Sequence, residues 1–113
     1  MDWTSGWYLY AFYGQTGLKV KLNKDGVTNS CNWNSTQNQI KGTDVANSLI
    51  RIGKNKGFEN TTDWLTGIKK GKVIACVSGI WDEAAIKKMY GKNYAAAMLP
   101  AYNCNGKKVQ MST

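Results

Sequence analysis

The residues of this sequence that are best suited to ligand contact are aromatic, and Trp81 is the first of them. It follows the apolar run KVIACVSGI at residues 72–80 and stands directly before a helical pattern at residues 82–90. The apolar run predicts a fully buried strand over residues 73–77. Open α/β folds bind their ligands at the carboxyl ends of such strands. The position of Trp81 therefore predicts one large flat ring at a ligand-binding edge.

Residues for acid–base or nucleophilic catalysis are largely missing. The sequence has no histidine, which excludes Ser-His-Asp and Cys-His catalysis and the commonest zinc ligand. Asp82 and Glu83 are the carboxylates to consider for hydrolysis, but neighbouring helical positions point about 100° apart. Both carboxylates also match the dipole of the helix that they begin. We therefore expect no enzyme activity, no metal and no cofactor.

Three cysteines, Cys31, Cys76 and Cys104, are spaced too widely for a CxxC metal or redox motif. Cys76 falls inside the predicted strand and is expected to be an inert core thiol. In an exported protein one disulfide is compatible with this content, and Cys31 with Cys76 is the first pairing to consider. At least one thiol is then left over, and sequence alone does not fix the pairing.

The chain is basic, with 15 Lys and Arg against 7 Asp and Glu and a formal net charge of +8. Such a balance raises nucleic acid as a partner. The bases are scattered, however, and Arg51 is the single arginine, whereas nucleic-acid sites favour arginine's planar fork. We favour a lysine-rich solvated surface without a nucleic-acid partner. The alternative is a small nucleic-acid-binding module with four stacking rings: Trp3, Trp7, Tyr8 and Tyr10.

The 113 residues, 42% of them hydrophobic, suffice for one domain over residues 1–113. Apolar periodicity and turn residues predict its elements. These are a short helix at 7–13, a hairpin from 18–22 that returns at Val27, a helix at 35–56 with a Thr36/Gln39 capping box, a helix from 61 or 62 to 70, the strand at 73–77, the helix at 82–90, a strand at 94–99 and a hairpin of 102–104 with 107–111 around Asn105-Gly106.

The string from Gly71 to Met111 resembles the extracellular sugar-binding proteins of bacterial ABC importers, in particular the maltose/maltodextrin-binding family. The likeness lies in an ordered series: a strand, a small-Gly-x-Trp turn, an amphipathic helix, NYAAAMLP and a hairpin with NGK. It extends with less force to the opening MDWTSGWY. Because the family's proteins are much longer, the resemblance implies a fragment, part of the C-terminal lobe of a two-lobed protein.

This resemblance implies an α/β fold, a three-layer α/β/α piece of a type II periplasmic-binding-protein-like lobe with peripheral β-hairpins. It further implies that oligosaccharide binds between the lobes and passes to a membrane permease. Trp81 matches the tryptophan that stacks on a glucosyl ring, while Trp7 and Tyr8 match cleft aromatics and Ser5 is a nearby hydroxyl partner. A piece of such a lobe leaves sheet edges exposed, which would invite self-association.

The resemblance also implies a parent protein that is extracellular, lipid-anchored at the cell surface or periplasmic. No apolar run approaches the roughly 20 residues that cross a bilayer, and the first residues lack the pattern of a secretory signal. The leader of an exported parent is therefore expected to lie outside this sequence.

Overall fold

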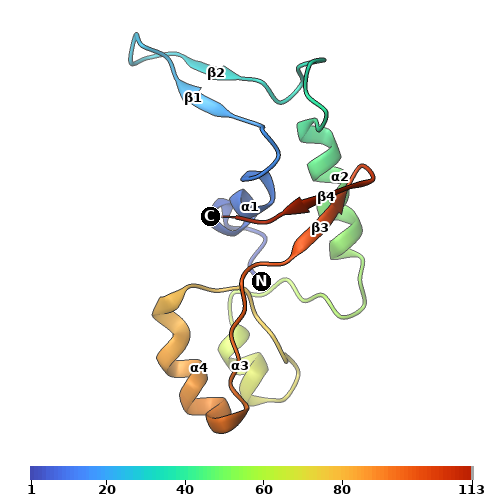
Figure 1. The fold of residues 1–113 in the computed structure, drawn as a ribbon. Coiled ribbons are helices and arrows are strands. Elements are labelled where there is room, and N and C mark those ends of the chain that lie inside the picture. The colour runs from blue at the N-terminus through green and yellow to red at the C-terminus, as the bar shows by residue number, and fades with distance from the viewer. Residues whose placement is uncertain (113) are drawn as a thin grey trace.

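The structure, a computed structural model, describes residues 1–112. It mixes helices with two separate two-stranded antiparallel sheets, so it is α/β in the general sense (Figure 1). In chain order the elements are α1 (Gly6–Tyr13), β1 (Val20–Leu22), β2 (Asn29–Cys31), α2 (Gly42–Gly53), α3 (Trp64–Lys69), η1 (Ile80–Asp82), α4 (Glu83–Tyr90), η2 (Gly91–Asn93), β3 (Ala101–Cys104) and β4 (Lys107–Gln110), where η marks a single 3-10 turn.

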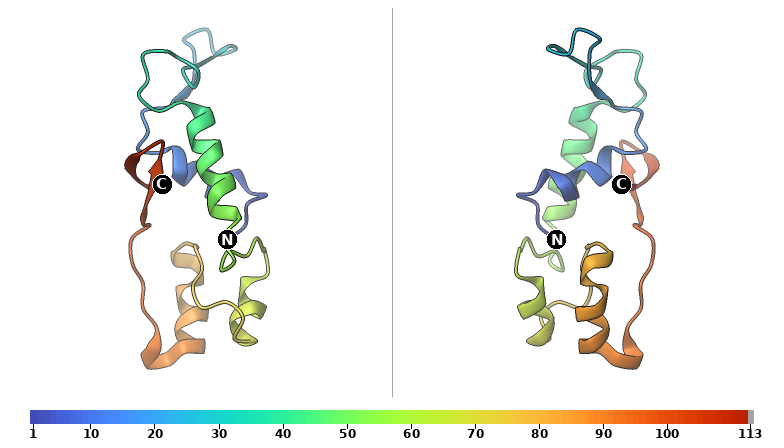
Figure 2. Two further views of the ribbon diagram at one scale, coloured as in Figure 1. Left: turned by 90° about the vertical axis from the view of Figure 1, so that its right-hand side faces the viewer. Right: turned by 90° about the vertical axis from the view of Figure 1, so that its left-hand side faces the viewer.

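The elements are arranged along one long axis. The β1–β2 hairpin lies at one end, α1, α2 and the β3–β4 hairpin lie in the middle, and α3 and α4 lie at the other end (Figures 1 and 2). The chain extends over 48 × 33 × 21 Å with a radius of gyration of 16.7 Å. A compact domain of this length has a radius of gyration of about 13 Å. The molecule is therefore elongated and leaves much apolar surface uncovered.

The buried core lies in the middle part, where α1, α2 and the β3–β4 hairpin meet. Phe12, Val45, Tyr102 and Val109 are among its buried side chains. The hydroxyl of Tyr102 donates a hydrogen bond of 2.7 Å to the backbone carbonyl of Phe12. Burial is the main reason that the pKa of Tyr102 is raised above that of an exposed tyrosine. Tyr102 therefore joins the last hairpin to the first helix.

Both predicted hairpins are confirmed. Tyr102 pairs with Val109 across the β3–β4 hairpin, and Val20 pairs with Cys31 across the β1–β2 hairpin. Asn105 and Gly106 have φ values of 50° and 76°, which is the left-handed geometry that a two-residue type I′ turn requires. The short helix at α1 is also confirmed, as are a shorter helix at α3 and the helix expected at 82–90, which is formed by the end of η1 and by α4.

The predicted strands at 73–77 and 94–99 are wrong. Both segments are irregular, and Ile74 and Met98 are 88% and 89% exposed. Within residues 1–112 neither segment has a partner strand, and a central strand forms only when neighbours pair with its backbone. The hydroxyl of Tyr90 instead donates to the carbonyl oxygens of Val73 and Ile74. Without these strands the described residues form no sheet with helices on both faces, and the three-layer arrangement is not confirmed.

The helix predicted at 35–56 is shorter, because α2 begins only at Gly42. Residues 35–38 form turns, in which the Asn38 side-chain amide donates to the carbonyl of Asn32 at 2.6 Å. The predicted Thr36/Gln39 capping box is therefore wrong. The carboxylate of Asp44 instead accepts a 2.8 Å hydrogen bond from the backbone N–H of Lys41 at the start of α2.

Candidate functional site

Trp7 and Trp81 lie side by side on the surface, although they are far apart in the sequence. Their ring centroids are 6.3 Å apart and their planes are inclined by 59°. Both rings are largely exposed, Trp7 by 65% and Trp81 by 60%. Trp7 comes from the first turn of α1, and Trp81 is the middle residue of η1. The two indoles form an open aromatic surface, which we call the tryptophan pair.

Gly79 fixes the place of the Trp81 ring. A Cβ atom at position 79 would overlap the Cη2 and Cζ3 atoms of Trp81. The backbone of Gly79 is extended, with φ −108° and ψ 178°, so glycine is needed here for space and not for its backbone freedom. The turn is closed by a 3.1 Å hydrogen bond from the Asp82 N–H to the Gly79 carbonyl and by the Ser78 hydroxyl, which donates to the Asp82 carboxylate.

The tryptophan pair offers faces for stacking, with polar groups beside it. An indole face suits apolar C–H groups or another π-system, while hydroxyl groups of a ligand need polar partners. Ser5, two residues before Trp7, makes no capping hydrogen bond to α1 from its side chain. At the start of α4, Glu83 forms a 2.6 Å ion pair with Lys87. Asp82 and Glu83, the two carboxylates that follow Trp81 in the sequence, therefore contact Ser78 and Lys87 respectively.

The structure brings together two of the four residues predicted for ligand contact. Tyr8 is adjacent to Trp7 on α1, about 100° around the helix. It is half-buried, and among the ring pairs of residues 1–112 it takes part in none. The ring of Trp81 is exposed, but its expected place at the end of a buried strand is wrong. A ligand-binding role for Trp81, Trp7, Tyr8 and Ser5 stays a prediction.

A second group of aromatic residues was not singled out from the sequence. Tyr13 and Trp33 stack with centroids 4.5 Å apart and an interplanar angle of 12°. They line a shallow pocket of about 360 Å³ that we call the aromatic–lysine pocket; its other lining residues are Tyr10, Leu18, Lys19, Val20 and Lys21. The signal in the sequence was the spacing of Trp7, Tyr10 and Tyr13, which places three rings along one side of a helix. Trp33 joins them only through tertiary packing.

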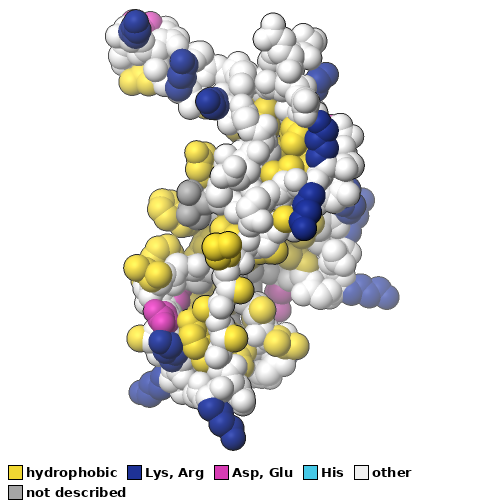
Figure 3. All heavy atoms as spheres, viewed as in Figure 1, with side chains coloured by type: hydrophobic (Ala, Val, Ile, Leu, Met, Phe, Trp, Pro, Cys, Tyr) yellow, Lys and Arg dark blue, Asp and Glu magenta, His cyan; other side chains and the backbone are white. Residues whose placement is uncertain are grey.

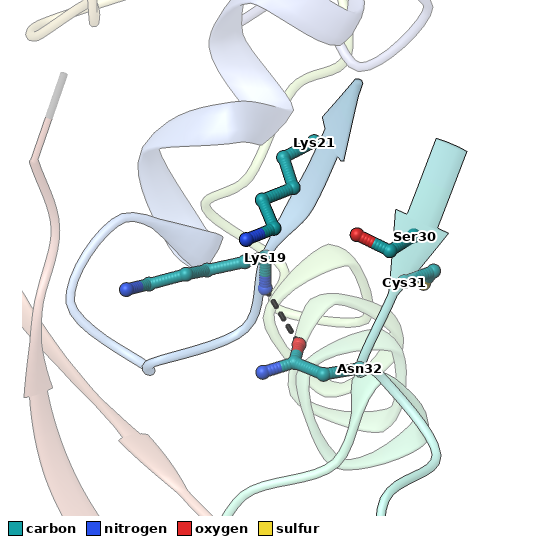
Figure 4. A pocket seen from close by; sticks show the side chains of 5 residues that line it. All are labelled: Lys19, Lys21, Ser30, Cys31 and Asn32. Carbon is teal, nitrogen blue, oxygen red and sulfur yellow. Dashed lines mark hydrogen bonds between the residues drawn. The ribbon is translucent and has the colours of Figure 1, made fainter. Parts of the chain in front are cut away.

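A smaller pocket of about 260 Å³ adjoins the first and shares Lys19 and Lys21 with it (Figure 4). Its remaining lining residues are Ser30, Cys31 and Asn32. The backbone N–H of Lys19 donates to Oδ1 of Asn32 at 2.7 Å, which fixes the start of the hairpin. In Figure 4 the side chains of both lysines extend away from β2. No carboxylate lines either pocket.

The set of rings in the nucleic-acid alternative is not intact. Trp3 packs on Phe58 at 4.4 Å, contacts Phe12 edge to face at 6.3 Å and lies against Gly53 of α2. Its Nε1 atom is buried without a hydrogen-bond partner. Trp3 therefore belongs to the packing of the chain. Lysine and arginine side chains stand mostly at the periphery of the face shown in Figure 3, and hydrophobic side chains gather over its middle and lower parts.

The predicted Cys31–Cys76 disulfide is absent, because all three cysteines are free thiols. Cys31 belongs to β2, at one end of the molecule, and Cys76 belongs to the segment between α3 and α4, in the part near the other end (Figure 1). Cys76 is half-buried, and this burial, followed by the charge of Asp82, raises the pKa of its thiol. The expected strand position of Cys76 is wrong, because residues 73–77 have no partner strand within residues 1–112.

Residues 1–112 contain neither a metal-binding cluster nor a membrane-spanning helix. No group of three or more His, Cys, Asp or Glu is placed to hold a metal ion. No helix in the described part of the chain has the length and apolarity to cross a membrane.

Comparisons with known proteins gave no relative. No protein-family model matches the chain, and neither a curated protein nor a solved structure matches it.

Proposed function

We propose that this chain is part of one lobe of a sugar-binding protein that serves a bacterial ABC importer of the maltose/maltodextrin type. The lobe binds oligosaccharide by stacking Trp81 and Trp7 on sugar rings, performs no catalysis and uses no cofactor. The complete parent protein works outside the cytoplasmic membrane and delivers the sugar to a permease. The resemblance of residues 71–111 to that family supports this proposal.

The observation that carries the proposal is the exposed tryptophan pair. Large aromatic rings are normally buried to a high degree, and here two of them stand together with more than half of each side chain exposed. Gly79 leaves room for the Trp81 ring, so this indole has a defined place on the surface. A defined and exposed pair of indoles suits the apolar faces of neighbouring sugar rings.

The proposal that the chain is a part of a lobe is supported by surfaces that lack a partner. Ile74, Ile80 and Met98 are almost fully exposed, and the segments 73–77 and 94–99 are irregular and have no neighbouring strands within residues 1–112. In the parent lobe these segments pair with further strands, and the resulting sheet is the middle layer of an α/β/α arrangement. In isolation, such uncovered apolar segments favour association between copies of the chain.

The test is a titration of the ¹⁵N-labelled chain with maltotriose and longer maltodextrins, followed by NMR. We expect saturable shifts of the indole Nε1–H resonances of Trp7 and Trp81. Trp81→Ala should weaken binding by about 1–3 kcal/mol, as expected for an aromatic anchor. Because the ring is largely exposed, the free energy of unfolding should change by only about 0.5 kcal/mol.

Ile80→Ala is the matched control, since Ile80 is also exposed and apolar and stands next to Trp81 but has no ring. It should leave the affinity unchanged. An equal loss in both variants would show a general apolar contact and contradict stacking. Binding of oligothymidylate with a steep dependence on salt, in place of saccharide binding, would contradict the proposal in favour of nucleic acid.

A further inference from the structure

The tryptophan pair continues along α1 into the aromatic–lysine pocket. Trp7, Tyr10 and Tyr13 follow one another at intervals of three residues, so each ring is about 4.5 Å farther along the helix axis and lies partly over the same side. Tyr10 is 63% exposed and lines the pocket with Tyr13. Trp81 adds a ring at the first end of this stripe and Trp33 adds one at the other. Each step of three residues turns by about 60° around the helix, so these rings run obliquely along α1 from the tryptophan pair toward the pocket.

The two ends of this surface differ in charge. Asp82 and Glu83 stand next to Trp81 in sequence, and the nearest lysine of α4 is paired with Glu83. At the other end Lys19 and Lys21 line both pockets, and no carboxylate does. Because they are two residues apart in an extended segment, Lys19 and Lys21 lie on the same side of the backbone. The pocket end of the stripe thus carries two lysines and no carboxylate, whereas two carboxylates follow Trp81 in the sequence at the other end.

We infer that the aromatic–lysine pocket is a second subsite, which binds a sugar ring that carries an anionic group. This inference rests on the proposed function and narrows the ligand to an acidic oligosaccharide. Its neutral rings lie on Trp7 and Trp81, and its charged ring lies on Tyr10. A carboxylate of a uronic acid or a sulfate ester then accepts hydrogen bonds from the ammonium groups of Lys19 and Lys21.

The charge distribution favours this ligand over a nucleic-acid strand. A strand carries one negative charge on every unit, so it would place phosphates near Asp82 and Glu83 as well as near the lysines. An oligosaccharide with an anionic group on one terminal ring matches a surface that is basic at one end alone. Ser30, which lines the adjoining pocket, provides a hydroxyl for the hydroxyl groups of the same ring, while Asn32 holds the start of the hairpin through Lys19 and Gly17.

The test compares three trisaccharides of the same backbone on the full chain at low salt. They are maltotriose, maltotriose oxidised at the terminal C6 to a uronic acid, and maltotriose sulfated at the same position. We expect at least one of the charged ligands to bind about fivefold more tightly than the neutral one, with an advantage that shrinks as salt rises. Which of the two binds more tightly tells a carboxylate ligand from a sulfate ligand.

The decisive variant is the double substitution Lys19→Gln and Lys21→Gln. It should remove the advantage of the charged ligand and leave the affinity for maltotriose unchanged. Lys54→Gln with Lys56→Gln lowers the net charge equally at a site outside both pockets and should preserve the advantage. Tyr10→Ala should weaken the charged ligand while the Trp81 indole resonance still shifts.

The outcomes separate this inference from the proposed function. Equal binding of all three trisaccharides, or an equal loss of the advantage in both double variants, overturns the acidic subsite and leaves sugar binding at the tryptophan pair intact. A chain whose Trp81 resonance responds to no saccharide overturns both. Tighter binding of oligothymidylate than of any saccharide also overturns both and assigns the stripe to nucleic acid.

Discussion

The indole of Trp81 lies directly against the α-carbon of Gly79, and no side chain fits between them. The two residues belong to one turn, in which Asp82 donates its backbone N–H back to Gly79. The surface position of the ring is thus set locally by a residue without a side chain, while the neighbouring ring of Trp7 arrives from α1.

Gly79→Ala should therefore act on ligand binding through the ring of Trp81. The added methyl group has to push the indole from its place, because the extended backbone at position 79 accepts alanine without strain. We expect the affinity for oligosaccharide to fall by about 1–3 kcal/mol, as for loss of the ring itself. An NMR titration that follows the Trp7 and Trp81 indole resonances measures this change.

Gly57→Ala is the control for that substitution, because a Cβ atom at position 57 meets nothing within 4 Å. This variant should bind as the parent chain does. If Gly79→Ala binds equally well and leaves the Trp81 indole resonance unmoved, the close approach described above has no functional consequence.

Tyr102→Phe should destabilise the middle of the molecule. The substitution removes the hydroxyl that donates to the Phe12 carbonyl and leaves that buried acceptor without its partner. The expected cost is about 1–3 kcal/mol of the free energy of unfolding, measured by urea denaturation. Tyr10→Phe removes a hydroxyl from an exposed ring and should have an effect within about 0.5 kcal/mol. Equal stability of the two variants would contradict the importance of this hydrogen bond.

The turn of the β1–β2 hairpin should depend on pH through Asp25. Hydrogen bonds from the Thr28 hydroxyl and then from the backbone N–H groups of Val27 and Thr28 lower the pKa of this carboxyl. A group with a lowered pKa stabilises the folded turn above its unfolded pKa, and this stabilisation disappears as the pH falls through the lowered value. The amide resonances of Val27 and Thr28 should therefore titrate below the ordinary range of aspartate.

Asp25→Asn should abolish that titration, since asparagine keeps an acceptor oxygen but carries no charge. A titration midpoint at or above the ordinary pKa of aspartate in the parent chain would show that the three hydrogen bonds do not favour the ionised form.

Amides of residues 73–77 should exchange rapidly with solvent in the isolated chain. The segment is irregular and has no partner strand in the described part of the chain, and the described hydrogen bonds of its amides are limited to Val73, which donates to Gly67. Tyr102 and Val109, which pair across β3 and β4, should exchange much more slowly. In the larger lobe that we propose, residues 73–77 should become protected as well. Slow exchange in the isolated chain would mean that this segment has found a partner, in the same copy or in another.

Turn signals in the sequence predicted both hairpins, whereas the local capping signal at Thr36 and Gln39 was wrong. The Asn105-Gly106 pair specifies its turn through the backbone angles of two residues, and the alternation at Leu18, Val20 and Leu22 specifies the start of the first hairpin. The strand expected at residues 73–77 failed for the opposite reason. Its apolar run predicts burial, but burial needs neighbouring strands, and the described chain places none there.

The candidate site was predictable only in part. Trp81 was singled out because of its position after a Gly-containing turn, and it is exposed as expected. Its pairing with Trp7 arises from the packing of two distant segments, which no local pattern encodes. The contribution of Trp33 to the aromatic–lysine pocket has the same origin. Trp3 shows the converse case. It is close in sequence to the exposed Trp7, but its own ring packs against Phe58.

The hydrogen bond between Tyr102 and Phe12 joins residues that are 90 positions apart, and Ser112 adds a second link of 3.0 Å to the carbonyl of Ala11. During synthesis on the ribosome, the first helix is therefore made long before the hairpin that holds it in place. Contacts of such long separation slow folding and prolong the exposure of apolar segments. The first helix consequently stays without this partner, as nascent chain, until about 90 further residues have been made.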